Sequence, residues 1–114
     1  MANYITDQQI MVDILADMIY ASAHWIQEIQ TSIPWNNLQG ECVEDKWFNC
    51  LHCGGELIII DNEDYEKHTV NFRQLLKAIS FIRHQPQFKD ESSWDGTFAD
   101  SIIQTAVFGE LVFD

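Results

Sequence analysis

The chain has 114 residues, a hydrophobic fraction of 46% and a formal net charge of −12, from 18 acidic and six basic side chains. This length suits one domain with one core, and the apolar content excludes an intrinsically disordered chain. The charge argues against direct binding to a nucleic-acid backbone or to an anionic membrane without a bridging metal, since both repel carboxylates. No apolar run reaches the roughly 18 residues of a membrane span, and Met1–Asn3 lacks the basic start of a signal peptide. We therefore expect a single domain over residues 1–114, soluble in the cytoplasm.

The N-terminal third is predicted to be one long helix that begins after Thr6 and runs to about Thr31. Thr6 and Gln9 fit a capping box, and Asp7 adds a favourable charge at the helix start. The helix should end before Pro34, because a residue that precedes proline is biased to extended geometry. The apolar residues recur at steps of three and four and form one face: Ile10, Met11, Ile14, Leu15, Met18, Ile19, Ile26 and Ile29.

Residues 34–55 are predicted to be irregular, because they are rich in turn-forming Pro, Asn and Gly. Trp35 and Trp47 make this segment too apolar for a free linker, so we expect a structured loop with a short helical turn. A β-hairpin should follow. Its first strand is predicted at Glu56–Asp61, and its second strand within Tyr65–Val70, after a short acidic loop.

Two further helices are predicted in the C-terminal half. Asn71 is a suitable N-cap for a helix that ends near His84, and a polar loop over residues 85–95 separates it from a helix at Gly96–Phe108. Gly109 stands where a left-handed C-cap residue is expected, and Leu111–Phe113 is predicted to add an edge strand to the hairpin. The predicted fold class is α+β, a small antiparallel sheet packed against about three helices.

Two segments resemble a family of small uncharacterised phage and prophage proteins. The first runs from Gly54-Gly55-Glu56 through the strand, the acidic turn and the second strand into the helix at Phe72–Ile79. The second is the ending, Ala99–Gln104 followed by Ala106–Phe113 with its Phe-Gly-Glu motif. This chain closes on Phe113-Asp114 where the relatives usually close on Tyr-Gly. The family has no established activity, so the resemblance implies a phage context and no catalytic residue. Small acidic phage proteins include anti-CRISPR and DNA-mimic anti-restriction inhibitors of host defence.

The cysteines suggest a zinc site. Cys50 and Cys53 have the spacing of a chelating pair, and Gly54-Gly55 leaves room for the backbone around an ion. A tetrahedral set would be completed by Cys42 and by His52 or His68. The sequence contains no second pair at zinc-finger spacing and no thioredoxin-like context, so plain reduced cysteines are the alternative.

Several acidic groups are candidates for binding. Asp13 and Asp17 lie one turn apart on the polar face of the first helix, with His24 and Glu28 farther along that face. They are interpreted either as an acid–base or metal site, or as a solvated acidic face offered to a basic partner. The acidic residues of the predicted hairpin could suggest a calcium-binding loop. Their order lacks the central glycine and the glutamate at position 12 of an EF-hand loop, which argues against calcium. A further acidic set flanks the last helix: Asp90, Glu91, Asp95 and Asp100. Of these, Asp95 and Asp100 are interpreted as helix-start residues and not as ligands.

A basic protein surface is the natural partner of such a charge. We therefore expect a phage-encoded binding protein, not an enzyme, that inhibits a host nucleic-acid-processing defence complex by occupying its Lys/Arg-lined groove. The sequence contains no nucleophile elbow, phosphate-binding glycine loop or zinc-protease motif, so no catalytic residue and no cofactor is expected. A zinc-stabilised adaptor and a homodimeric phage accessory protein are the alternatives. The expected contact residues are Asp13, Asp17, Glu28, Asp61, Glu63, Asp64, Glu66, Trp35 and Trp47.

Overall fold

The computed structural model describes residues 6–113. Within them the elements are α1 (Asp7–Ala21), β1 (Ile26–Thr31), η1 (Trp35–Asn37), α2 (Val43–His52), β2 (Glu56–Asp61), β3 (Lys67–Asn71), α3 (Phe72–Arg83), η2 (Pro86–Phe88), η3 (Glu91–Ser93) and α4 (Gly96–Phe108), where η denotes a 3₁₀ helix. The strands form one antiparallel sheet in the order β1-β2-β3. The predicted α+β class is confirmed, with four α-helices in this part of the chain.

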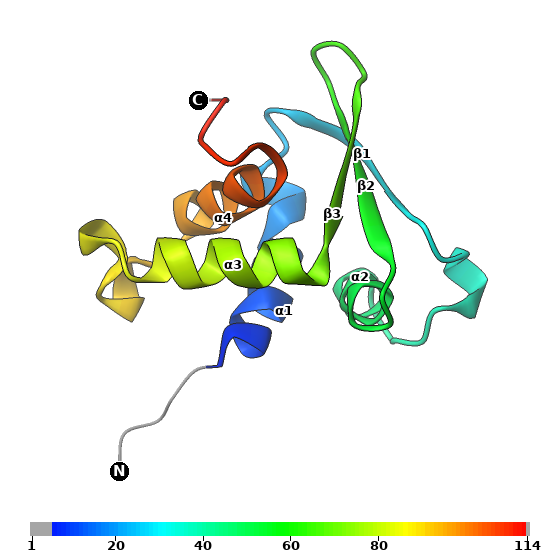
Figure 1. Ribbon diagram of the computed structural model, residues 1–114, viewed down its shortest axis with the longest axis horizontal. Helices are drawn as coiled ribbons and strands as arrows, with labels where there is room; N and C mark the ends of the chain where they lie inside the picture. Colours follow the sequence, from blue (N-terminus) through cyan, green and yellow to red (C-terminus); the bar gives the residue numbers. More distant parts are fainter. Residues whose placement is uncertain (1–5, 114) are drawn as a thin grey trace.

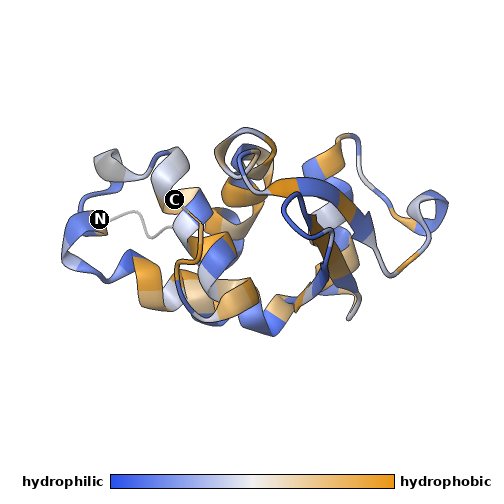
Figure 2. Cartoon of the chain, turned by 90° about the horizontal axis from the view of Figure 1, so that it is seen from above, coloured by the Kyte–Doolittle hydropathy of each residue, from blue (hydrophilic) through white to orange (hydrophobic). Residues whose placement is uncertain are grey.

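The core lies where α1, α3 and α4 pack on one another and meet the sheet (Figure 1). Figure 2 shows that hydrophobic and hydrophilic residues alternate along the helices. This pattern is expected of amphipathic helices that bury one face. In the residues that the structure describes, no helix is long and apolar enough to cross a membrane. The largest fully buried apolar side chains are Trp25, Met11, Leu15, Met18, Leu51, Leu57, Ile59, Leu75, Ile79, Ile102 and Ile103.

The predicted N-terminal helix begins as expected but is ten residues too long. The Thr6–Gln9 capping box is present, with both of its hydrogen bonds, but the helix ends at Ala21 and Ile26–Thr31 is a strand. A β-bulge lies between Ile26 and Glu28. Because a bulge adds one residue to the strand, Ile26 and Ile29 can both pack against the core despite their three-residue spacing. That spacing also fits a helix, which explains the error.

The prediction of an irregular segment at residues 34–55 is also partly wrong. A ten-residue helix, α2, occupies Val43–His52, although the short helical turn at Trp35–Asn37 agrees with the expectation. Trp47, Cys50 and Leu51 are buried at helical spacing on its inner face. The helix has no side-chain N-cap, since the N-cap residue Cys42 makes no capping hydrogen bond. The absence of a typical N-cap residue is one reason why this helix was not predicted from the sequence.

The hairpin and the two C-terminal helices are confirmed. Strand β2 has the predicted bounds, and β3 begins at Lys67, two residues later than the predicted extended segment. Asn71 caps α3 in a capping box with Gln74, and Gly109 ends α4 in the left-handed conformation with φ of 81°.

The predicted edge strand at Leu111–Phe113 is wrong. The backbone amides of Val112 and Phe113 donate to Oε1 of the buried Gln104, each at 2.8 Å, and the Phe113 ring stacks on Trp25 with centroids 5.3 Å apart. The amides that a sheet would need are therefore used by a side chain of α4, and the segment folds back on that helix.

Asp100 of α4 is the polar centre of the core. Its Oδ1 accepts hydrogen bonds from the Ser22 hydroxyl at 2.6 Å and the Trp25 indole at 2.7 Å. Its Oδ2 accepts from the Gln104 amide at 2.8 Å and lies 3.5 Å from Nε2 of His24. One carboxylate thus joins the turn after α1, the middle of α4 and, through Gln104, the C-terminal segment. This network fixes the turn that ends α1 early.

Candidate functional site

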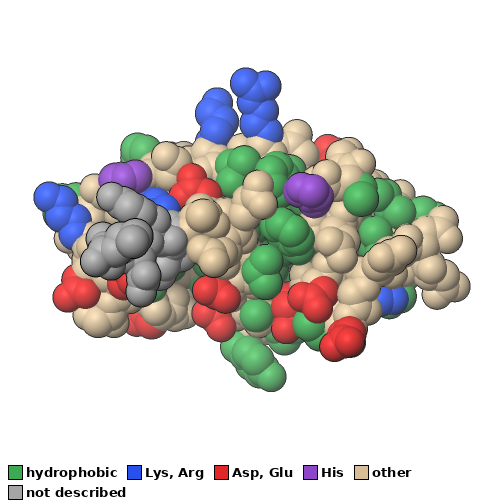
Figure 3. All heavy atoms as spheres, turned by 90° about the horizontal axis from the view of Figure 1, so that it is seen from below, with side chains coloured by type: hydrophobic (Ala, Val, Ile, Leu, Met, Phe, Trp, Pro, Cys, Tyr) green, Lys and Arg blue, Asp and Glu red, His purple; other side chains and the backbone are tan. Residues whose placement is uncertain are grey.

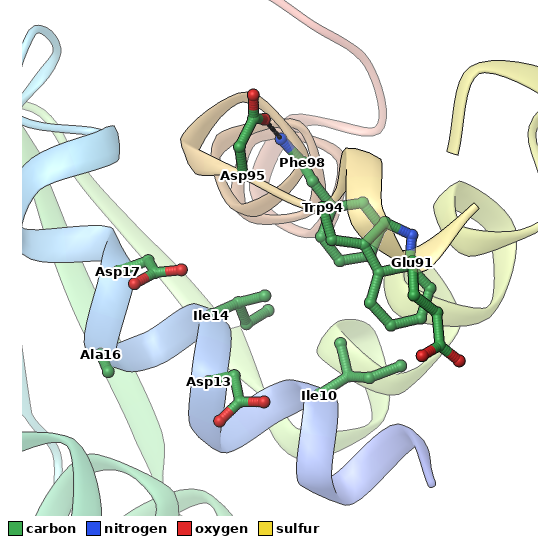
Figure 4. A pocket seen from close by; sticks show the side chains of 9 residues that line it. All are labelled: Ile10, Asp13, Ile14, Ala16, Asp17, Glu91, Trp94, Asp95 and Phe98. Atoms are coloured by element: carbon green, nitrogen blue, oxygen red, sulfur yellow. Dashed lines mark hydrogen bonds between the residues drawn. The ribbon is translucent and has the colours of Figure 1, made fainter. Parts of the chain in front are cut away.

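The structure brings two acidic segments together around a groove between α1 and the start of α4. The groove has a volume of about 410 Å³. Figure 4 shows the helix α1 on one bank and the segment from Glu91 to Phe98 on the other. Its lining residues are Ile10, Asp13, Ile14, Ala16, Asp17, Glu91, Trp94, Asp95 and Phe98.

The rim of this acidic groove carries four carboxylates. Asp13 and Asp17 are exposed on α1, and Glu91 and Asp95 are exposed on the opposite bank. Asp95 is also the N-cap of α4, where its Oδ1 accepts from the amides of Thr97 and Phe98. Among the described residues no Lys, Arg or His forms an ion pair with these four side chains. The groove therefore concentrates negative charge that the molecule does not neutralise itself.

The floor of the groove is apolar and rigidly held. Ile10, Ile14 and Phe98 are buried, and the Trp94 ring stacks on Phe98 with centroids 4.7 Å apart and an interplanar angle of 5°. The Trp94 indole donates to the carbonyl of Phe88 at 2.8 Å, which fixes the orientation of the ring. An apolar floor beneath a charged rim suits a ligand with an apolar body and a cationic end.

Acidic side chains predominate over part of the surface. Arg73 and Lys77 are exposed on α3, and Lys89 is exposed beside Asp90 and Glu91. In the view of Figure 3, Lys and Arg side chains project from one edge and also lie near the two ends of the molecule, whereas most of the visible Asp and Glu side chains lie toward the opposite edge. A basic partner would be attracted to that acidic edge.

Asp61 is not a surface contact residue, contrary to the expectation from sequence. Its side chain is buried, with 4% of the residue exposed. Oδ1 accepts from the amides of Glu63 and Asp64, and Oδ2 pairs with Nε2 of His68 at 2.8 Å. The carboxylate therefore closes the hairpin loop. Its pKa is lowered by the hydrogen bond with His68 and by those with the amides of Asp64 and Glu63, against burial, which raises it.

The lowered pKa of Asp61 predicts a pH effect on the hairpin. A carboxyl with a depressed pKa stabilises the fold above its unfolded pKa of about 3.9, and this contribution is lost as pH falls through the folded value. The Asp61→Asn substitution should therefore destabilise the protein at about pH 5, and its effect should shrink as the pH falls below about 3.9. Chemical unfolding of both proteins across this window measures the difference. A difference that stays constant with pH would contradict this role.

Asp61, Glu66 and His68 are the one group in residues 6–113 in which three potential metal-ligand atoms lie within 4.8 Å of one another. Both oxygens of Asp61 and Nε2 of His68 are already engaged in hydrogen bonds. A cation would have to displace the His68 contact, and the hydrogen bonds account for the cluster without one.

The other predicted contact residues lie apart from the acidic groove. Glu63, Asp64 and Glu66 are exposed at the hairpin tip, and Glu28 is exposed on β1, where it accepts from Gln30. Trp35 is 40% exposed, with the Lys46 ammonium 4.9 Å from its ring centre. Trp47 is buried in the core, so the expectation that it is an exposed anchor is wrong.

The predicted zinc ligands are not brought together. Cys42 and Cys53 stand at opposite ends of α2, about 15 Å apart for a ten-residue helix, whereas a zinc–sulfur bond is about 2.3 Å. Cys50 is buried and Sγ donates to the Glu56 carbonyl at 3.5 Å, while His52 is exposed. For Cys42, the Asp45 amide lowers the pKa of the thiol, but the acidic side chains of Glu44 and Asp45, together with desolvation, raise it more.

Glu91 and Asp95 are rim residues that the sequence does not indicate as contact residues: it places Glu91 only in an acidic set beside the last helix, and Asp95 at the helix start. The signal for their role is spatial, because residues 91–98 and α1 are distant in sequence and meet only through the packing of α1 on α4. No family model, curated protein or solved structure matches this chain.

Proposed function

We propose that the protein is a non-enzymatic binding protein that docks its acidic face on a Lys/Arg-lined surface of a nucleic-acid-processing complex and inhibits it. The observation that carries the proposal is the acidic groove, in which Asp13, Asp17, Glu91 and Asp95 converge without an ion-pair partner in the described residues. A groove that normally holds phosphates would accept these carboxylates in their place.

The proposal keeps the partner expected from sequence and changes the residues that meet it. Asp61 and Trp47 are no longer proposed as contact residues, because they are buried. Glu91 and Asp95 are proposed in their place, because they line the acidic groove. The resemblance to phage proteins favours a host defence nuclease or a CRISPR complex as the target class, in the bacterial cytoplasm.

Co-purification at two salt concentrations tests the proposal. The tagged protein is expressed in a bacterial host that carries active CRISPR and restriction systems, and recovered at low and at high salt. We expect a nuclease or nucleic-acid-binding complex at low salt that is lost at high salt, because salt screens exposed charges. Recovery of the protein alone at both salt concentrations would reject the proposal.

A homo-oligomeric accessory protein is the second candidate, and one observation favours it. Phe81 of α3 and Leu111 after α4 are each 62% exposed and line the same hollow, of about 470 Å³. Exposed apolar side chains that gather in this way are typical of interfaces. Light scattering coupled to size-exclusion chromatography decides this point: a defined dimer supports the candidate, and a monomer at high concentration rejects it.

A further inference from the structure

We propose that the acidic groove receives the side chain of a single arginine from the basic partner. The inference rests on the proposed function and deepens it, since it names the chemical group that the groove binds. In Figure 4 the side chains of Ile10, Ile14 and Trp94 line the space between the two banks, and the carboxylates of Asp13 and Glu91 flank it. This arrangement offers one apolar surface for a methylene stem and two acidic banks for its charged end.

The groove is large enough to admit one long side chain. Its volume of about 410 Å³ lies within the range of about 300–1,000 Å³ that ligand pockets in proteins span. The groove is open to solvent through its exposed rim, where Asp13, Asp17, Glu91 and Asp95 stand. A side chain can therefore enter while its backbone stays outside, on the partner.

The spacing of the rim carboxylates favours a guanidinium over a metal ion. Divalent calcium or magnesium needs oxygen ligands at about 2.0–2.6 Å, which requires the ligands to converge on one point. In the described residues, no three of the four rim carboxylates place oxygens within 4.8 Å of one another. A guanidinium has five N–H donors in a plane and can serve separate carboxylates on opposite banks.

The protein itself already places a guanidinium against the same aromatic wall. Arg83 donates to Oδ1 of Asp7 at 2.7 Å, and its guanidinium carbon lies 5.5 Å from the Trp94 ring centre. The Trp94 ring is thus already in contact with Arg83 and with Phe98, which stacks on it. The charge of an incoming arginine is therefore expected to be met by the rim carboxylates, with the apolar floor in contact with its methylene stem. Lysine is expected to bind less well, because its ammonium is a compact and strongly hydrated charge.

A titration followed by nuclear magnetic resonance tests the inference on the full chain. The probes are three capped Gly-X-Gly tripeptides in which X is arginine, lysine or norleucine. Saturable shifts of the Ile10 and Ile14 methyl signals and of the Trp94 ring signals are expected with the arginine peptide. We expect it to bind a few-fold more tightly than the lysine peptide and about tenfold more tightly than the norleucine peptide. The D13N/D17N variant should lose about tenfold in affinity, and the matched E63Q/D64N variant should keep it.

The outcomes separate this inference from the function on which it rests. Shifts that avoid the groove signals, equal binding of arginine and norleucine, or larger groove shifts with calcium or magnesium alone would each overturn it. If the arginine peptide does not bind the groove while a basic complex is still recovered at low salt, the inference about the groove is wrong and the proposed function is retained. If recovery also fails, both fall.

Discussion

Replacing Asp100 with alanine is expected to lower the free energy of unfolding by about 3–5 kcal/mol, because it removes a carboxylate that holds several partly buried donors. The Ser22 hydroxyl, the Trp25 indole and the Gln104 amide would each lose an acceptor within 2.8 Å. Chemical denaturation followed by tryptophan fluorescence measures the loss, since the Trp25 ring reports on this site directly. A loss below about 1 kcal/mol would contradict the central role of Asp100.

The Asp100→Asn variant sharpens the same test. If the asparagine oxygen stays with Ser22 and Trp25, its amide nitrogen faces the amide of Gln104, donor against donor. Gln104 cannot rotate to relieve this, because its Oε1 accepts from the amides of Val112 and Phe113. We therefore expect an intermediate loss of stability and faster amide exchange at residues 112 and 113. Asp17→Ala, on the exposed rim, is the control and should not lower stability.

Neutralising the rim of the acidic groove is expected to have the largest effect on binding. The D13N/D17N/E91Q variant removes three negative charges from the rim. Each exposed ion pair between a rim carboxylate and a basic peptide contributes only modestly to the binding free energy. Together the three substitutions should weaken binding of an arginine-rich peptide about tenfold to a hundredfold at low salt. The measurement is fluorescence anisotropy with a labelled peptide at two salt concentrations.

The matched control for this variant carries the same change of charge at the hairpin tip. E63Q/D64N/E66Q also removes three carboxylates, all exposed and all expected from sequence to bind. If only net charge matters, the two variants weaken the peptide equally, and the groove has no special role. We expect the tip variant to lose no more than about threefold, through long-range attraction alone.

Local signals predicted much of the fold, and the errors share a physical cause. The capping box at Thr6, the N-cap at Asn71 and the left-handed Gly109 depend on residues close in sequence, and all three are confirmed. The strand at Ile26–Thr31 was hidden because a bulge mimics helical spacing, and the C-terminal segment because Gln104 supplies its hydrogen bonds from α4. Both depend on contacts between distant segments.

The candidate site was predictable only in part, for the same reason. The high acidity and the pair Asp13 and Asp17 are visible in the sequence, and they lie on the groove rim. Glu91 and Asp95 join them only because α1 packs on α4. Asp61 has the same side chain as Asp13 but serves the hairpin loop, because its oxygens meet two backbone amides and His68. Residue type alone does not separate these roles.

The most direct test of the account compares the partners recovered by three proteins at low salt: the wild type, D13N/D17N/E91Q and E63Q/D64N/E66Q. The account predicts that the wild type and the hairpin-tip variant recover the same basic nucleic-acid-processing complex and that the groove variant does not. Equal recovery by the groove variant, in folded form, would contradict the claim that the acidic groove is the binding site.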